Sequence, residues 1–218
     1  MILHPLRNNY WVRRGYVTGT CMYHSELKKC YINIPKNASS FIRETFKDVG
    51  WKHMHLGMHM DIDNYIVILR DPIERWITGI AQHITSNVLG ENFGSTHYLE
   101  QNNELVNRLI FDQVVFDDHT EQQSWFLEPF DLKDAVFFYC DANLNRNLDS
   151  YFANRFQLMN KPYVNTSASQ FDNSNLVKHF KTLVYNNKTY YNRIKSYFLR
   201  DYDLINSVNF YGTRQSNS

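Results

Sequence analysis

Cysteine is scarce in this sequence, and the three cysteines that occur lie far apart. Cys21, Cys30 and Cys140 are too few and too scattered to form a disulfide framework. No Cys-x-x-Cys pair is present that would indicate a zinc site. We therefore expect three reduced thiols.

An excess of charge of one sign is also absent. The chain has 23 Lys and Arg residues against 22 Asp and Glu residues, a net charge of +1, so it has no global field to attract nucleic acid or anionic lipid. No apolar run approaches the roughly 18 residues of a membrane span, and the N-terminal residues contain no apolar core of a signal peptide. We expect a cytoplasmic protein with no membrane or nucleic-acid partner, and any bound anion must be held by a local site.

Internal repeats and linkers rich in Pro, Gly or Ser are missing as well. Hydrophobic residues make up 43% of the 218 residues and aromatic residues 16%. This apolar surface is sufficient for a packed core, which excludes a disordered or fibrous chain. Because domains contain about 100–200 residues, we expect a single domain over residues 1–218.

Short apolar runs alternate with segments of helical periodicity. Residues 30–34 predict a buried strand that leads into a helix over residues 38–50, and residues 65–69 predict a second strand. The second strand leads into a helix that begins at Pro72 with Asp71 as its N-cap. The remaining predicted elements are helices at 119–127, 144–156, 173–184 and 189–207 and a third strand at 135–140. This alternation predicts an α/β fold with a mostly parallel central sheet flanked by helices.

The loop after the first strand has the composition of an anion site. Unpaired backbone N–H groups and the positive end of the helix dipole favour an anion at such a position, and one lysine and two hydroxyls add donors. The Walker A pattern is absent, which disfavours ATP or GTP. The alternative is an ordinary turn with a serine as helix cap and the lysine in solvent. The loop residues are Pro35, Lys36, Asn37, Ala38, Ser39 and Ser40.

The loop after the second strand offers a guanidinium and a hydroxyl. Arg70 follows the strand directly, and Thr78 lies two turns inside the helix, where it can face the same crevice. Together they suit a terminal phosphate. The alternative is a salt-bridged turn between Arg70 and Asp71, with Arg75 paired to Glu74 or another neighbour. Ligands of parallel sheets bind at the carboxyl ends of the strands, where both loops are expected.

The segments Pro-Lys-Asn-Ala-Ser-Ser (35–40) and Arg-Asp-Pro-Ile-Glu-Arg-Trp-Ile-Thr (70–78) resemble the two nucleotide-binding motifs of sulfotransferases that use 3′-phosphoadenosine 5′-phosphosulfate (PAPS). The resemblance is closest to the carbohydrate O-sulfotransferases, including the heparan 2-O type. In that family the first loop holds the 5′-phosphosulfate, and an arginine and a hydroxyl eight residues later hold the 3′-phosphate. Arg70 and Thr78 have this spacing, although the family usually has serine at the second position. Further similar segments follow in the family's order at 117–123, 137–139, 163–167 and 197–204.

The resemblance implies a P-loop-like three-layer sulfotransferase fold. It also implies transfer of a sulfuryl group from PAPS, as co-substrate, to a hydroxyl of a carbohydrate or other small acceptor. Lys36 would then act on the leaving oxygen, and no metal would be needed. One alternative is a P-loop-type kinase of a nucleotide or metabolite, and another is a binding module that kept the fold without activity. The implied nucleotide contacts are Pro35, Lys36, Asn37, Ala38, Ser39, Ser40, Arg70, Thr78, Asn165 and Ser167.

The acceptor hydroxyl must lose a proton, and a histidine can accept it. Related enzymes take their base from the stretch between the two motifs, so His59 is the first candidate and His55 the second. His119, with Gln122 and Gln123 one turn away, is a third candidate that could also orient the substrate. Each has the alternative of an ordinary core or surface histidine. The alternating histidines of the first stretch lack a carboxylate or cysteine partner, so we expect no metal site.

Overall fold

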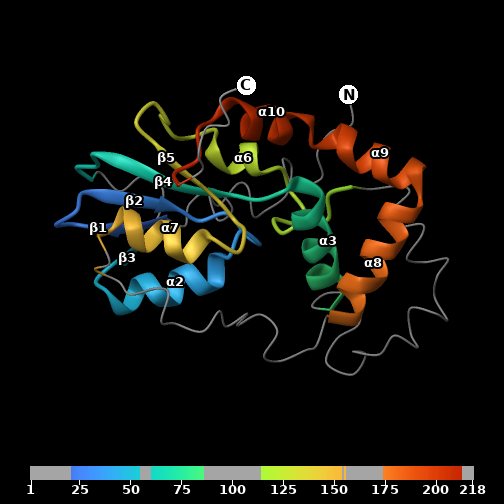
Figure 1. Ribbon diagram of the computed structural model, residues 1–218, viewed down its shortest axis with the longest axis horizontal. Coiled ribbons are helices and arrows are strands. Elements are labelled where there is room, and N and C mark those ends of the chain that lie inside the picture. The colour runs from blue at the N-terminus through green and yellow to red at the C-terminus, as the bar shows by residue number, and fades with distance from the viewer. Residues whose placement is uncertain (1–20, 55–59, 86–113, 154, 156–173, 213–218) are drawn as a thin grey trace.

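The computed structural model describes residues 21–54, 60–85, 114–153, 155 and 174–212 (Figure 1). Strands and helices alternate along the chain, which confirms the predicted α/β class. The strands are β1 (Cys21–His24), β2 (Lys29–Ile32), β3 (Lys52–Met54), β4 (Asn64–Leu69) and β5 (Val136–Tyr139). The helices are α2 (Ser39–Asp48), α3 (Pro72–His83), α6 (Gln123–Leu127), α7 (Leu144–Tyr151), α8 (Ser174–Asn186), α9 (Lys188–Tyr197) and α10 (Leu199–Ser207).

The five strands form one mixed sheet in the order β3-β1-β2-β4-β5. Strands β2, β4 and β5 are parallel neighbours, whereas β1 pairs antiparallel with both β2 and β3. The prediction of a mostly parallel sheet is therefore wrong, since only the β2-β4-β5 half is parallel. The turn at residues 25–28 explains the difference, because a connection this short can join only antiparallel strands.

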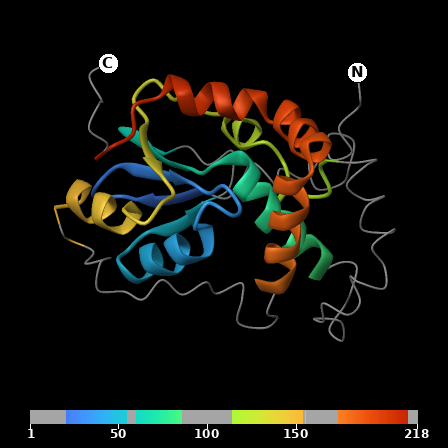
Figure 2. The same ribbon diagram turned by 45° about the vertical axis from the view of Figure 1, so that its right-hand side comes forward.

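Helices cover both faces of the sheet, as expected. In Figure 2, α10 runs across the top of the sheet while α2 and α7 lie below it. Alternate strand residues supply the two cores: Tyr31 and Ile66 pack with Phe46 of α2, and Ile32 and Val67 pack with Phe126 of α6. A third cluster joins α3 to α8 and α9 beside the sheet. The parallel strands are thus buried on both sides, and their carboxyl ends lie next to α3.

Only the second half of the helix predicted at 119–127 is helical, as α6, and residues 119–122 form a turn and its exit. Asp117 accepts a hydrogen bond from the backbone N–H of His119, and the Thr120 hydroxyl accepts from the N–H groups of Phe116 and Asp117. Such local bonds from Asp and Thr side chains compete with helix formation. They place His119 in a turn that faces α3.

Two other predicted helices have different limits in the structure. The one predicted at 144–156 ends at Tyr151, and Ala153 just beyond it has a left-handed φ of 53°. The one predicted at 189–207 is divided at the buried Phe198 into α9 and α10. None of the helices in the described ranges has the length and apolar character needed to cross a bilayer.

Candidate functional site

The two predicted motifs are in direct contact at the carboxyl ends of β2 and β4. These strands are parallel neighbours, with Ile32 opposite Val67, so the loops that follow them emerge at the same edge of the sheet. The Arg70 guanidinium bridges the loops, because its Nη1 donates to the Lys36 carbonyl oxygen at 3.1 Å and to Thr78 Oγ1 at 3.2 Å. One side chain therefore contacts the first loop and the predicted phosphate-binding hydroxyl.

The first loop presents an uncapped helix end. Lys36 and Ala38 have left-handed φ values of 67° and 59°, an uncommon conformation for residues other than glycine. Ala38 is the N-cap of α2, no side chain caps this helix end, and its first turn has no acidic residue. The N-cap residue itself therefore supplies no side-chain acceptor to this turn, and successive backbone N–H groups next to left-handed residues form concave anion sites. This end of α2 can receive an oxyanion.

The Lys36 ammonium contacts α3. Its Nζ donates to Gln82 Oε1 at 3.2 Å. Burial lowers the pKa of Lys36 to about 8; Asp117 opposes that shift, and Arg70 adds to it. The lysine is therefore charged at neutral pH but close to titration, and an anion bound beside it would favour the protonated form.

The start of α3 differs from that of α2 because its own side chains cap it. Asp71 accepts from the backbone N–H of Glu74 at 2.9 Å, as its predicted N-cap role requires. Arg70 contacts Thr78 as described above, and Thr78 Oγ1 is fixed by the carbonyl oxygens of Glu74 and Arg75. An anion at this loop would be held by the Arg70 and Thr78 side chains, not by the helix end.

Arg75 has a role that the sequence analysis missed. The sequence allows a pair with Glu74, but the guanidinium is fully buried and donates to three backbone carbonyl groups. These belong to Pro35 at 2.9 Å, Asp118 at 3.0 Å, and Glu121. Burial lowers the pKa of Arg75 to about 10, an effect that Asp201 opposes, so it stays charged at neutral pH. It ties the first loop to the segment that carries His119.

The buried side-chain amides of Asn37 and Gln123 are hydrogen-bonded to each other and connect the two loops. Asn37 Nδ2 donates to the Ile68 carbonyl at 2.7 Å and to Gln123 Oε1 at 2.6 Å. Gln123 in turn accepts from the Arg70 backbone N–H at 3.0 Å, and its Nε2 donates to the Arg70 carbonyl at 2.8 Å. Asn37 and Gln123 are both fully buried. Their position fixes the backbone of each loop relative to the other.

Asp201 of α10 completes this network and was also missed. Its carboxylate oxygens accept from the backbone N–H groups of Gln123 and Ser124, each at 2.8 Å. Burial raises the pKa of Asp201, and the two N–H groups and the Arg75 charge oppose that shift. The carboxylate thus caps α6 and holds Gln123 in place. No short sequence motif indicates this long-range role of Asp201.

His119 lies beside two aspartates in a segment that packs against α3. Its Nδ1 lies 3.3 Å from Asp117 and 3.1 Å from Asp118, and His83 Nδ1 lies 2.8 Å from Asp117. Burial opposes protonation, but Asp117 and Asp118 raise the pKa of His119 to about 9. Burial alone would raise the pKa of Asp117, whereas His119 and His83 hold it well below its usual value. At neutral pH His119 is therefore a cation and a proton donor.

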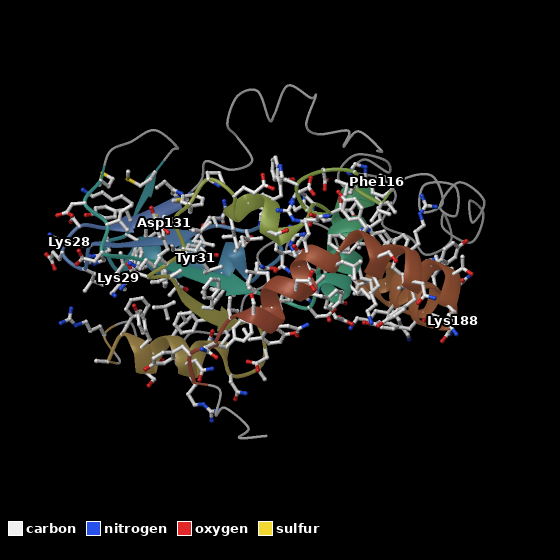
Figure 3. The ribbon with its side chains drawn as sticks, turned by 90° about the horizontal axis from the view of Figure 1, so that it is seen from above. Lys28, Lys29, Tyr31, Phe116, Asp131 and Lys188 are labelled. Carbon is white, nitrogen blue, oxygen red and sulfur yellow. The ribbon has the colours of Figure 1, made fainter. Side chains whose placement is uncertain are left out.

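Asp117, Asp118 and His119 are also a group that could ligate a metal ion, since one ligand atom from each lies within 4.8 Å of the others. The ion pairs between these side chains account for their proximity without a metal. In Figure 3 the neighbouring Phe116 lies beside α3, and its ring centroid is 5.3 Å from that of His83. This contact packs the segment against the helix.

Gly79 of α3 allows this close approach. A Cβ at this position would overlap the carbonyl group of His119, a backbone group that cannot rotate away. The sequence does not reveal this role of Gly79, because one glycine in a helical pattern gives no indication of what packs against it.

The remaining predicted site residues fall outside the described ranges. These are His55, His59, Asn165 and Ser167. The structure brings the two loops together at the carboxyl ends of β2 and β4, and Arg70 links them to Thr78. His119 lies against α3 at Gly79, and Arg75 ties its segment to the first loop. The residues of the two loops are Pro35, Lys36, Asn37, Ala38, Ser39, Ser40 and Arg70. No protein-family model, curated protein or solved structure matches this chain.

Proposed function

We propose that this protein is a sulfotransferase that moves a sulfuryl group from PAPS to a hydroxyl of a carbohydrate or other small acceptor. The observation that carries the proposal is the bridge made by Arg70, which contacts both Lys36 and Thr78. The uncapped end of α2 and the Thr78 hydroxyl thus lie on either side of one guanidinium. A nucleotide with phosphates at both its 5′ and 3′ positions fits such an arrangement.

In the proposed reaction the acceptor oxygen attacks sulfur in line with the leaving group. The bond between sulfur and the bridging oxygen breaks, and adenosine 3′,5′-bisphosphate (3′,5′-ADP) leaves with the negative charge on its 5′-phosphate. Lys36 and the N–H groups at the start of α2 stabilise that charge as it develops. Because Lys36 is partly desolvated, its electrostatic effect there exceeds that of a lysine in water.

The proton of the acceptor hydroxyl needs a base that is neutral at working pH. Because Asp117 and Asp118 raise the pKa of His119 to about 9, this histidine suits stabilisation of the sulfuryl oxygens better than proton abstraction. We therefore assign the base to His59, with His55 as second choice, on the resemblance alone. Substitution of each by alanine, with turnover measured against 3′,5′-ADP affinity, separates a base from a binding residue.

Calorimetric titration of the protein with 3′,5′-ADP and with ATP plus magnesium tests the assignment. We expect micromolar or tighter binding of 3′,5′-ADP, no binding of ATP, and sulfate transfer from labelled PAPS to at least one member of an acceptor panel. Binding of ATP with magnesium but not of 3′,5′-ADP would favour the kinase alternative. Binding of 3′,5′-ADP without turnover on any acceptor would leave only a binding module.

A further inference from the structure

The Glu74 carboxylate is held in a fixed position on α3. Its Oε1 accepts a hydrogen bond from the Tyr185 hydroxyl at 2.9 Å, and its Oε2 pairs with Lys181 Nζ at 2.7 Å. Both partners come from α8, which packs against α3. The Glu74 side chain is 26% exposed, so a ligand can reach it. Each carboxylate oxygen can accept more than one hydrogen bond, which leaves acceptor capacity for a ligand donor.

Glu74 also lies beside the pair to which we assign the 3′-phosphate. It precedes Thr78 by four residues, so the two side chains project from the same face of α3. The Thr78 hydroxyl donates to the backbone carbonyl of Glu74 at 3.2 Å, which fixes the hydroxyl on this face of the helix. Burial opposes ionisation of Glu74, but Lys181 and Tyr185, with a smaller contribution from Arg70, lower its pKa. An ionised carboxylate therefore lies one helical turn from Thr78 on the same face of α3, near enough to Arg70 to feel its charge.

A carboxylate next to a bound phosphate repels a second anion but accepts a hydrogen bond from a neutral hydroxyl. In a nucleoside 3′-phosphate, the 2′-hydroxyl is the neighbour of the phosphate on the ribose ring. Acidic side chains accept hydrogen bonds from ribose hydroxyls in dinucleotide-binding folds. If the phosphate moved to the 2′ position, it would lie against the carboxylate or lose the Arg70–Thr78 pair.

We propose that Glu74 accepts a hydrogen bond from the ribose 2′-hydroxyl and thereby selects 3′-phosphorylated over 2′-phosphorylated adenosine. Lys181 and Tyr185 act as positioning residues that hold the carboxylate in place and partly neutralise its charge beside the phosphate. This inference rests on the proposed function, because it requires the 3′-phosphate to bind Arg70 and Thr78.

The test removes the two partners of the proposed hydrogen bond, the Glu74 carboxylate and the ribose 2′-hydroxyl, separately and together. Affinities for 3′,5′-ADP and its 2′-deoxy analogue are measured by calorimetry with the wild-type protein and the Glu74→Met variant. For the wild type we expect the deoxy analogue to bind about tenfold more weakly, the lower range for a hydrogen bond to a charged group. In Glu74→Met the two ligands should bind within about twofold of each other.

Discrimination against adenosine 2′,5′-bisphosphate gives a second readout. The wild type should prefer the 3′,5′ isomer, and Glu74→Met and Glu74→Gln should each reduce that preference by about tenfold or more, because the repelling charge is gone. Glu128→Met is the matched control, since Glu128 also forms a surface ion pair, with Arg200 at 3.2 Å on other elements. The control should keep both wild-type ratios. Melting temperatures confirm that each variant is folded.

The possible outcomes separate the two proposals. If loss of the 2′-hydroxyl weakens binding by the same factor in the wild type and in Glu74→Met, and the preference for the 3′,5′ over the 2′,5′ isomer is unchanged, the role of Glu74 is overturned. The proposed function would still stand. If the wild type fails to bind 3′,5′-ADP at all, both fail. A reduced deoxy effect in Glu74→Met, absent from Glu128→Met, supports the inference.

Discussion

Removal of the Asp201 carboxylate should destabilise the protein more than any single change on the surface of α10. The carboxylate is fully buried and accepts two backbone hydrogen bonds at 2.8 Å. Each buried N–H group left without an acceptor costs about 1–3 kcal/mol. Removal also takes away a negative charge near the buried Arg75, while it relieves the desolvation of the carboxylate itself. We therefore expect Asp201→Ala to lower the free energy of unfolding by about 2–5 kcal/mol.

Urea unfolding followed by tryptophan fluorescence measures this change. Asp203→Ala is the matched control, because Asp203 lies on the same helix and is exposed, so it corrects for the higher helix propensity of alanine. We expect the control to stay within about 0.5 kcal/mol of the wild type. Asp201→Asn keeps one acceptor oxygen and should lose about half as much as Asp201→Ala. The account of the buried network would be refuted if Asp201→Ala and Asp203→Ala had equal stability.

Four other substitutions, two of them combined with a pH series, test separate parts of the site. Lys36→Ala should lower turnover far more than 3′,5′-ADP affinity, because the lysine acts on developing charge. For the same reason, turnover of the wild type should lose its Lys36-dependent part as the pH rises above about 8, where Lys36 loses its proton, and an equal ratio of wild-type to Lys36→Ala turnover at pH 7 and pH 10 would contradict this. Arg70→Ala should weaken 3′,5′-ADP binding by about 2–5 kcal/mol in calorimetry; unchanged affinity would place the 3′-phosphate elsewhere. Gly79→Ala should lower the melting temperature, since its Cβ would overlap the His119 backbone. If the variant melts at the wild-type temperature, the His119 backbone does not lie this close to α3. The pKa of His119 rises from 6.5 in the unfolded chain to about 9 in the folded protein. Its protonation therefore contributes fully to the free energy of unfolding below pH 6.5, and this contribution is lost as the pH rises through 9. Asp117→Asn should make the free energy of unfolding, measured in urea, fall less steeply over this pH range, and a pH profile identical to that of the wild type would contradict the assignment.

The two loops could be predicted from the sequence because their signals are local. Strand 65–69, the N-cap Asp71 and Pro72 at the first helical position fix where α3 begins, and hence where Arg70 lies. The same holds for the loop that leads into α2. Strands that are parallel neighbours place such loops together, and the contact between Arg70 and Lys36 agrees with that expectation.

The antiparallel half of the sheet and the supporting network could not be predicted in the same way. Strand β1 has four residues and β3 three, which is too short for a periodic pattern to emerge. Arg75 and Asp201 look like surface charges in the sequence, yet both are buried. Their partners are backbone groups, some distant in sequence, and such partners leave no sequence pattern. The turn at residues 117–122 interrupts a helical pattern through local side-chain bonds.

A crystal structure of the protein with 3′,5′-ADP tests the central claim most directly. The account predicts one nucleotide across the two loops, with its 5′-phosphate on the N–H groups at the start of α2 and beside Lys36 Nζ, and its 3′-phosphate on Arg70 and Thr78. A nucleotide bound in the opposite direction, or bound away from both loops, would contradict it.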